Sequence, residues 1–460
     1  MTSHINLAFP VTRVLFLFLM CQFAAEIKDA LEAEGTEEWV WHLESKLDVD
    51  EIEAMKDAWK AGGVEGCMRY LESKRDEWKD VPLNVAVIGN SGVGKSSFIN
   101  AIRGLTKDDE GGAAVGVTAR TLEIRGYQHP DIPLFMFWDL PGIGTDHFRR
   151  ESYLSDIKVD RYDFFLLMTA DCFAESDIWF CKEFRKRNKK FFFVRTKIGL
   201  DVSTNNRAHP KTHKEEAMIE TIRQSTKAQL RESGFQDVPV FLIDSYQLDK
   251  FDFEKLKEQL IADLPDLKRT ALIFSLHSTS EKMIRLKVKE LRSRIWKCAL
   301  LSAGGAAIPV PGLSVAVHLN IIAHEAVFYF KQLGLDSESL KRTAELQSAD
   351  YKKIQSIVNK TLGIRGVGAV TVDSMKTIVT AILARSLPVA AQTAAEETLK
   401  TFVPVIGSLT AAPLSFGGTY SGLKLVLKKF EEVALDVMKA VADSAGMADE
   451  NGDAEATSHS

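Results

Sequence analysis

Two residues that could bind phosphate and magnesium, Lys95 and Ser96, end a glycine-rich run that follows the short apolar stretch 85–88. The run and the residue after it read Gly89, Asn90, Ser91, Gly92, Val93, Gly94, Lys95, Ser96 and Ser97. Glycines let successive backbone N–H groups point into one concavity at a helix N-terminus, which attracts phosphate oxygens. Lys95 is expected to reach the β- and γ-phosphates of a nucleotide, and Ser96 to give its hydroxyl to Mg²⁺. We therefore predict a phosphate-binding P-loop.

A second motif, Asp-Leu-Pro-Gly at residues 139–142, begins with an acidic residue and follows the apolar run 135–138. Asp139 is expected to hold Mg²⁺ through water, and the backbone N–H of Gly142 to contact the γ-phosphate. Loss of that contact on hydrolysis would release the following loop as a switch. Such a turn could also be purely structural, but its place downstream of a P-loop favours the switch.

A threonine between these two motifs should complete the magnesium shell. Thr118 and Thr121 are both candidates. Thr118 is preferred because it follows Gly116 and Val117 in an expected loop, whereas Thr121 begins an expected strand. The predicted metal ligands are Ser96, Thr118 and Asp139, and the predicted catalytic residues are Lys95, Thr118 and Gly142.

The motif that should read the base is incomplete. Thr196 and Lys197 end an apolar run, and a Thr-Lys-x-Asp sequence there would read guanine. The lysine stem would stack on the base, and the aspartate would accept two N–H bonds from guanine. Such hydrogen bonds can contribute a factor of about 10⁴–10⁵ to the discrimination between substrates. Position 199 is Gly, so Asp201 could substitute only if the loop shifts. The last base-contacting loop is expected at Asp244 and Ser245.

The elements that must position these residues are short apolar strands alternating with helical segments. The expected strands are Leu83–Ile88, Thr121–Tyr127, Leu134–Trp138, Phe164–Met168, Phe191–Val194 and Val240–Ile243. Continuous apolar runs of this length suit a parallel sheet covered on both faces. The fold class predicted is an α/β P-loop domain with a mainly parallel six-stranded sheet, joined to an all-α domain made of N- and C-terminal helices.

The expected division of the chain follows its composition. We assign residues 1–25 to an apolar N-terminal segment, 26–80 to N-terminal helices and 81–252 to the nucleotide-binding domain. A C-terminal helical region is expected at 253–440 and a disordered acidic tail at 441–460. Gly62 and Gly63 are expected to interrupt the N-terminal helices. The net charge of −5 gives no reason to expect nucleic acid as a partner. The five cysteines are scattered without metal-ligand spacing, as in reduced cytosolic proteins.

Three apolar stretches have open interpretations. Residues 14–21 follow Arg13 with the outline of a signal peptide, and are too short for a transmembrane helix. An apolar helix that packs on the body or touches a membrane is favoured over a cleaved signal. Residues 298–324 and 401–423 are each divided by proline and glycine. Either could be a buried helical hairpin, which is favoured, or a hairpin that enters a bilayer.

Taken together, the motifs resemble those of the immunity-related GTPases, the interferon-inducible family of defence against intracellular pathogens. The resemblance rests on the P-loop and on the runs at residues 137–144, 162–165, 193–197 and 263–265. It extends from roughly residue 30 to roughly residue 300, and Lys95 resembles the members that keep lysine in the P-loop.

The resemblance implies GTP and GDP as ligands, Mg²⁺ as cofactor, and a GTPase domain flanked by helices that pack into one helical domain. It also implies GTP-dependent self-assembly and a cytoplasmic protein peripherally associated with intracellular or pathogen vacuole membranes. The chain departs from the family at Gly199 and at Ala119, where a switch glutamate is expected, although Glu123 is close.

Hydrolysis is expected to need a second molecule. Ile143 follows Gly142 where a water-positioning glutamine could stand. Without such help, small GTPases turn over at about 10⁻⁴ per second. We hypothesise that a dimer completes the site, with Arg149 and Arg150 either contributing or forming a solvated loop pair. The alternatives are a non-catalytic nucleotide-dependent membrane scaffold and a P-loop enzyme acting on another nucleotide or small molecule.

Overall fold

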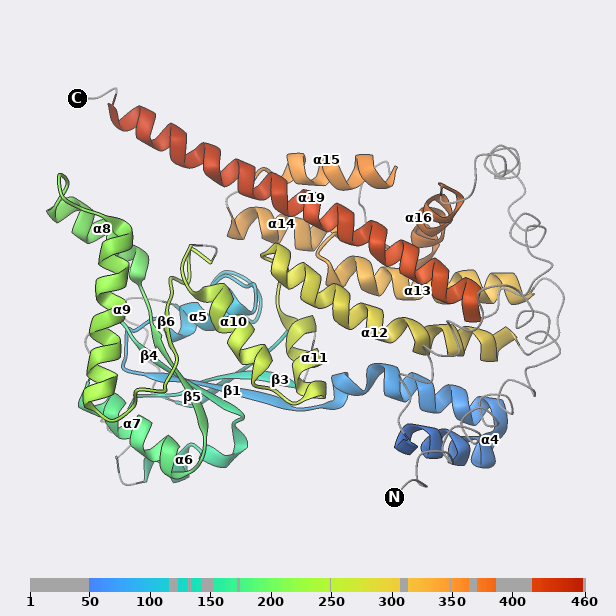
Figure 1. Cartoon of the computed structure of the whole chain (residues 1–460), viewed down its shortest axis with the longest axis horizontal. Helices are drawn as coiled ribbons and strands as arrows, with labels where there is room; N and C mark the ends of the chain where they lie inside the picture. The colour runs from blue at the N-terminus through green and yellow to red at the C-terminus, as the bar shows by residue number, and fades with distance from the viewer. Residues whose placement is uncertain are drawn as a thin grey trace, which may run out of the picture. The chain divides into compact units, whose positions relative to one another are not determined.

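A computed structural model describes residues 49–115, 123–130, 132, 134–142, 150, 152–171, 174–248, 250–306, 313–347, 349–363, 370–385 and 416–457 (Figure 1). The predictions for Thr118, Ala119, Thr121 and Arg149, and for residues 1–25 and 401–415, lie outside this part. The chain divides into two compact units, one built on a sheet and one built of helices.

The sheet has six strands, and parallel pairing dominates. The strands are β1 (Leu83–Gly89), β2 (Arg125–Gln128), β3 (Phe135–Asp139), β4 (Phe164–Thr169), β5 (Lys190–Arg195) and β6 (Val240–Leu242). Their order is β2-β3-β1-β4-β5-β6, and among the strand pairs in the part of the chain that the structure describes only β2–β3 is antiparallel. The predicted fold class is confirmed. The observed β2 covers the C-terminal end of the expected strand 121–127, and its mostly exposed edge position gives no apolar run to mark its start.

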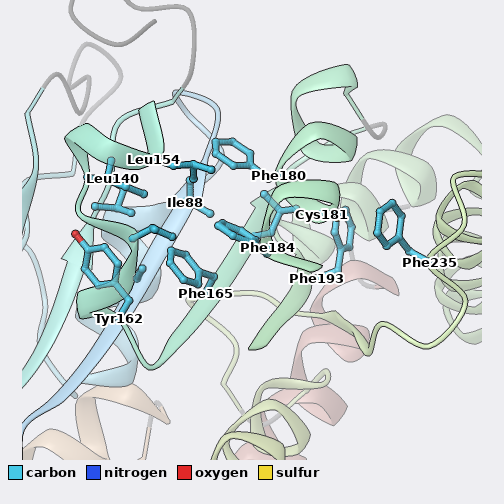
Figure 2. Close-up of a cluster of buried hydrophobic side chains, with 14 of the residues drawn as sticks. Ile88, Leu140, Leu154, Tyr162, Phe165, Phe180, Cys181, Phe184, Phe193 and Phe235 are labelled. Carbon is cyan, nitrogen blue, oxygen red and sulfur yellow. The ribbon is translucent and has the colours of Figure 1, made fainter. Parts of the chain in front are cut away.

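Buried side chains cover both faces of this sheet, because every residue of β4 is buried and successive residues point to opposite sides. Phe165 and Leu167 belong to a buried hydrophobic cluster. Figure 2 shows Phe165 in this cluster together with Phe180 and Phe184. The helices of this unit are α5 (Lys95–Ile102), α6 (Tyr153–Asp156), α7 (Glu175–Lys186), α8 (Ile198–Ala208), α9 (Glu215–Glu232), α10 (Phe253–Ala262) and α11 (Asp266–Ser275), with 3-10 turns η1 (Glu77–Asp80) and η2 (Val159–Arg161).

Helices from both ends of the chain form the second unit. It contains α4 (Val49–Asp76), α13 (Leu313–Gln332), α15 (Tyr351–Leu362) and α16 (Val372–Arg385), together with most of α12 (Glu281–Ala306) and of α19 (Phe416–Thr457). The helix α14 (Ser337–Leu346) is also divided between the units. The Arg294 guanidinium of α12 donates to the Arg75 carbonyl oxygen of α4 (2.9 Å), and Phe330 packs on Phe430. Gly62 and Gly63 break α4 as expected, with non-helical backbone angles.

Two boundaries differ from the sequence-based expectation. The helices α10 and α11, which the sequence placed in the C-terminal region, group with the sheet. The tail expected to be disordered begins at residue 441, whereas α19 extends to Thr457.

The apolar stretch 298–324 contributes to the helices α12 and α13. Among its described side chains, Cys298, Leu301, Ile322 and Ala323 are buried, whereas Asn320 and His324 are exposed. The choice between a buried hairpin and one that enters a bilayer stays a prediction. Among the residues that the structure describes, no helix combines the length and the apolar character needed to cross a membrane.

Candidate nucleotide site

The glycine-rich run forms the turn between β1 and α5, as predicted. Gly89 ends the strand, and a side-chain carbon there would collide with the carbonyl oxygen of Met168 on β4. Gly94 precedes the first turn of α5 with φ of 97°, a left-handed conformation that favours glycine. The run can therefore approach the sheet closely and begin a helix whose N-terminal N–H groups would bind a phosphate.

Lys95 folds back over the loop. Its ammonium group donates to the carbonyl oxygens of Gly89 (3.2 Å) and Asn90 (3.3 Å), and its side chain is only 4% exposed. Burial lowers the pKa of Lys95, and the charge of Asp139, whose Oδ1 lies 4.0 Å from Nζ, opposes this shift. A phosphate at the loop would offer the ammonium group a stronger acceptor than these carbonyl oxygens.

Ser96 and Asp139 meet at the carboxyl edge of the sheet. The Ser96 hydroxyl donates to Asp139 Oδ2 at 2.8 Å, and Asp139 is 2% exposed. Asp139 ends β3, which runs parallel to β1 and pairs with it through Val87, so both motifs reach the same edge. An alcohol oxygen and a carboxylate oxygen side by side are ligands suited to Mg²⁺. The donor set therefore fits the predicted magnesium site, which the Ser96 hydroxyl and, through water, the Asp139 carboxylate would hold.

The turn after Asp139 lies against the P-loop. A side-chain carbon at Gly142 would come within 3.3 Å of the Gly89 carbonyl oxygen. Tyr153, buried in α6, donates its hydroxyl to the Pro141 carbonyl oxygen at 2.5 Å and so holds this turn. Sequence reasoning missed Tyr153, because a tyrosine in a short, mixed segment gives no motif. Burial raises its pKa well above the usual value.

Thr196 and Lys197 form the turn between β5 and α8. The Thr196 hydroxyl donates to the carbonyl oxygens of Val93 (2.6 Å) and Thr169 (3.1 Å), and thereby ties this turn to the P-loop. Lys197 adopts a left-handed conformation with φ of 60°. A base contact by either residue stays a prediction, whereas the structural role of the Thr196 hydroxyl is directly visible.

The aspartate expected to replace the missing base reader is engaged elsewhere. The Arg195 guanidinium donates to Asp201 Oδ2 at 2.8 Å. Burial raises the pKa of Asp201, and the Arg195 charge opposes this shift. Residues two apart on a helix do not share a face, so the Asp201 side chain leaves α8 in a different direction from a side chain at residue 199. A base contact by Asp201 stays a prediction that this geometry does not favour.

The loop that follows β6, which contains Asp244, Ser245 and Tyr246, approaches both the turn at Gly199 and the start of α5. Gly199 donates its backbone N–H to Asp244 Oδ2 at 3.1 Å. The hydroxyl groups of Ser97 and Tyr246 lie 3.3 Å apart, which places the predicted phosphate and base loops side by side. Ser245, predicted to contact the base, is half-buried in this loop.

Arg150, a candidate for completing the site in a dimer, is paired within the chain. Its guanidinium donates to Glu175 Oε1 at 3.1 Å and lies 5.5 Å from the Trp179 ring centre. Both partners of this ion pair are more than a third exposed, and a contribution of Arg150 to a dimer stays a prediction.

Comparison with known proteins gives the following similarities. The family model described as interferon-inducible GTPase (IIGP) matches residues 48–396. Interferon-inducible GTPase 5 of Rattus norvegicus is 32% identical over 352 residues, which cover 76% of this chain and 74% of that protein. Interferon-inducible GTPase 1 of Mus musculus is 35% identical over 276 residues, 60% of this chain and 67% of that protein. T-cell-specific guanine nucleotide triphosphate-binding protein 2 of Mus musculus is 35% identical over 267 residues, 58% of this chain and 64% of that protein. The matched part thus spans slightly less than two thirds of this last relative.

Proposed function

The chain belongs to the interferon-inducible GTPase family, and we propose that it binds GTP with Mg²⁺ at the P-loop and hydrolyses it to GDP and phosphate. The observation that carries this proposal is the meeting of Ser96 with Asp139 beside the buried Lys95. These residues come from the P-loop and from the Asp-Leu-Pro-Gly motif, and they lie within hydrogen-bonding or ion-pair distance of one another.

Each group has a role that follows from its position. Lys95 would leave the two carbonyl oxygens of the loop and neutralise charge on the β- and γ-phosphates. Ser96 and Asp139 would hold Mg²⁺, which supplies further charge neutralisation when bound. Gly142, close to Gly89, would direct its backbone N–H to the γ-phosphate and couple hydrolysis to release of the following loop. Thr118 stays a predicted third ligand.

Calorimetric binding of GTP, GDP and ATP in the presence of Mg²⁺ tests this function. We expect micromolar affinity for the guanine nucleotides. Lys95→Ala should weaken GTP binding by about 10- to 100-fold, because hydrogen bonds to charged groups contribute about 1.5–3 kcal/mol each. The matched control is Lys182→Ala, which removes an exposed lysine of α7 and should leave affinity unchanged. Wild-type protein that binds none of the three nucleotides would refute the proposal.

Hydrolysis is proposed to depend on self-assembly. This rests on Ile143, which stands where a water-positioning glutamine would serve the site in cis. A second molecule would then supply the missing group, and turnover per molecule should rise with protein concentration until the dimer is saturated. Turnover that stays constant over a hundredfold range of concentration would exclude dimer-dependent activity.

The cellular role is proposed from the family. Interferon-inducible relatives support a part in cell-autonomous innate defence, with the protein cytoplasmic and peripherally associated with intracellular or pathogen vacuole membranes. Sedimentation of the full chain with phosphatidylcholine–phosphatidylserine vesicles tests the membrane step. GTP-dependent recovery with the vesicles is expected, and equal recovery with GTP, with GDP and without vesicles would contradict it.

A non-catalytic scaffold is the second candidate function. It is favoured by Gly199 and Ala119, which replace two residues that the family pattern associates with base reading and hydrolysis. Single-turnover measurement of phosphate release separates the two functions, since a scaffold would bind GTP and retain it intact.

A further inference from the structure

A carboxylate from the neighbouring strand occupies the space that a side chain at Gly199 would need. A side-chain carbon built on Gly199 would lie 2.8 Å from Asp244 Oδ2 and 3.2 Å from Gln247 Nε2. The φ of Gly199 is outside the left-handed region, so its backbone would accept other residues, but a side chain there would require the Asp244 carboxylate to shift. Asp244 follows β6, which pairs in parallel with β5 through Arg195 and Leu242. The two positions therefore meet at one edge of the sheet.

The Asp244 carboxylate is held in a defined orientation. Its Oδ2 accepts the backbone N–H of Gly199 at 3.1 Å, and its Oδ1 accepts the backbone N–H of Tyr246 at 2.8 Å. Asp244 is 8% exposed. A carboxylate has about four acceptor positions on its two oxygens, so each oxygen retains capacity for a further donor. The carboxylate is thus fixed without using up its hydrogen-bonding capacity.

Asp244 lies between the P-loop turn and the loop at Tyr246, where the base of a bound nucleotide is predicted. The hydroxyl of Thr196 connects the turn before Gly199 to Val93 of the P-loop at 2.6 Å. On the other side, Tyr246 is 76% exposed and places its hydroxyl 3.3 Å from that of Ser97. A nucleotide whose phosphates occupy the P-loop would extend its base between these two connections.

We propose that Asp244 reads guanine in this chain, in place of the carboxylate missing at residue 199; this inference rests on the proposed binding of GTP. Guanine presents two donors on one edge, N1–H and the 2-amino group, which match the two oxygens of a carboxylate. Adenine presents an acceptor at N1, which a carboxylate repels. The carboxylate therefore reaches the base from the loop after β6 rather than from the start of α8.

A purely structural role for Asp244 is the competing explanation. A carboxylate that accepts an N–H from the first turn of a helix stabilises that turn, and Gly199 lies in the first turn of α8. The experiment must therefore measure base selection, which helix capping leaves unchanged.

Asp244→Asn is the direct test. A carboxamide has an acceptor oxygen and a donor NH₂ group in place of two acceptor oxygens, and xanthine carries a carbonyl oxygen where guanine has its 2-amino group. We expect GTP affinity to fall by about 10- to 100-fold, and the affinity for xanthosine triphosphate to rise enough to invert the preference of the wild-type protein. Calorimetry with GTP, XTP and ATP gives all three affinities. A folded variant with an unchanged GTP-to-XTP ratio would reduce Asp244 to a helix cap and overturn the inference.

A second set of variants decides the matter if Asp244→Asn binds no nucleotide. Gly199→Asp should lose guanine preference, because the new side chain meets Asp244 Oδ2 and adds a second carboxylate. Asp244→Ser should lose it through removal of the acceptor. The double variant Gly199→Asp/Asp244→Ser should regain it, a strongly non-additive result. A double variant no better than either single variant would overturn the inference, and a wild-type protein that binds no GTP would refute the proposed function as well.

Discussion

The hydroxyl of Thr196 makes a sharp prediction, because it connects the base-side turn with the P-loop through two carbonyl oxygens. Thr196→Val preserves the shape of the side chain and removes only the donor. In the structure that donor lies 2.6 Å from the Val93 carbonyl oxygen and 3.1 Å from that of Thr169. The substitution should therefore destabilise the sheet unit and loosen the P-loop, without touching any group proposed to contact a phosphate.

The magnitude follows from the partners that remain. The Thr169 carbonyl oxygen keeps the backbone N–H of Thr196 at 2.8 Å, so its loss is small. The cost falls on the Val93 carbonyl oxygen, and a buried acceptor that loses its partner costs about 1–3 kcal/mol. We expect a decrease of about 1–2 kcal/mol in the free energy of unfolding. GTP affinity should fall as well, because binding would have to order the loosened loop.

Urea unfolding and calorimetry measure the two effects. Thr196→Ser retains the donor and should restore most of both losses. The matched control is Thr226→Val, since the buried Thr226 hydroxyl donates to the Ile222 carbonyl oxygen inside the regular helix α9. Its removal should cost less than about 0.5 kcal/mol. If Thr196→Val is no more destabilising than Thr226→Val, the hydroxyl does not tie the two loops together.

Two further predictions concern stability. Arg294→Met should lower the free energy of unfolding by about 3–5 kcal/mol in urea, because it leaves buried Glu325 without the guanidinium 3.0 Å away. The control Arg292→Ala breaks the ion pair with Glu431, where Arg292 is exposed, and should cost less than about 1 kcal/mol. Similar costs for the two variants would contradict this prediction. Burial raises the pKa of Asp177 to about 6 from 3.8, so its contribution to stability is complete below about pH 4 and is lost as the pH rises to about 6. Unfolding measured from pH 4 to 7 should therefore show a loss of about 2–3 kcal/mol that Asp177→Asn largely removes, and an identical pH profile for the variant would exclude this cause.

Much of the fold and the phosphate site follows from local sequence. Continuous apolar runs such as residues 164–168 mark buried parallel strands, and the six expected strands match those observed apart from the start of β2. The meeting of Ser96 with Asp139 also follows, because both motifs end neighbouring parallel strands whose carboxyl ends share one edge.

The base side could not be predicted in the same way. The sequence shows a missing aspartate at residue 199 and acids at residues 201 and 244, but it does not show their directions. Asp201 is only two residues from Gly199 in sequence, yet its position on the helix directs its carboxylate to Arg195. Asp244 is distant in sequence, and only the pairing of β5 with β6 brings it beside Gly199. Proximity along the chain is therefore a poor guide where a helix begins.

The shared space of Gly199 and Asp244 also limits how this site can change over generations. A side-chain carbon at residue 199 would lie 2.8 Å from Asp244 Oδ2, so acids at both positions would require the Asp244 side chain to move and would place two like charges together. A lineage that moves the acid from one loop to the other must pass through an ancestor with no acid or with two. The two positions should therefore be replaced together among descendants, so that an acid at residue 199 accompanies a small residue at residue 244.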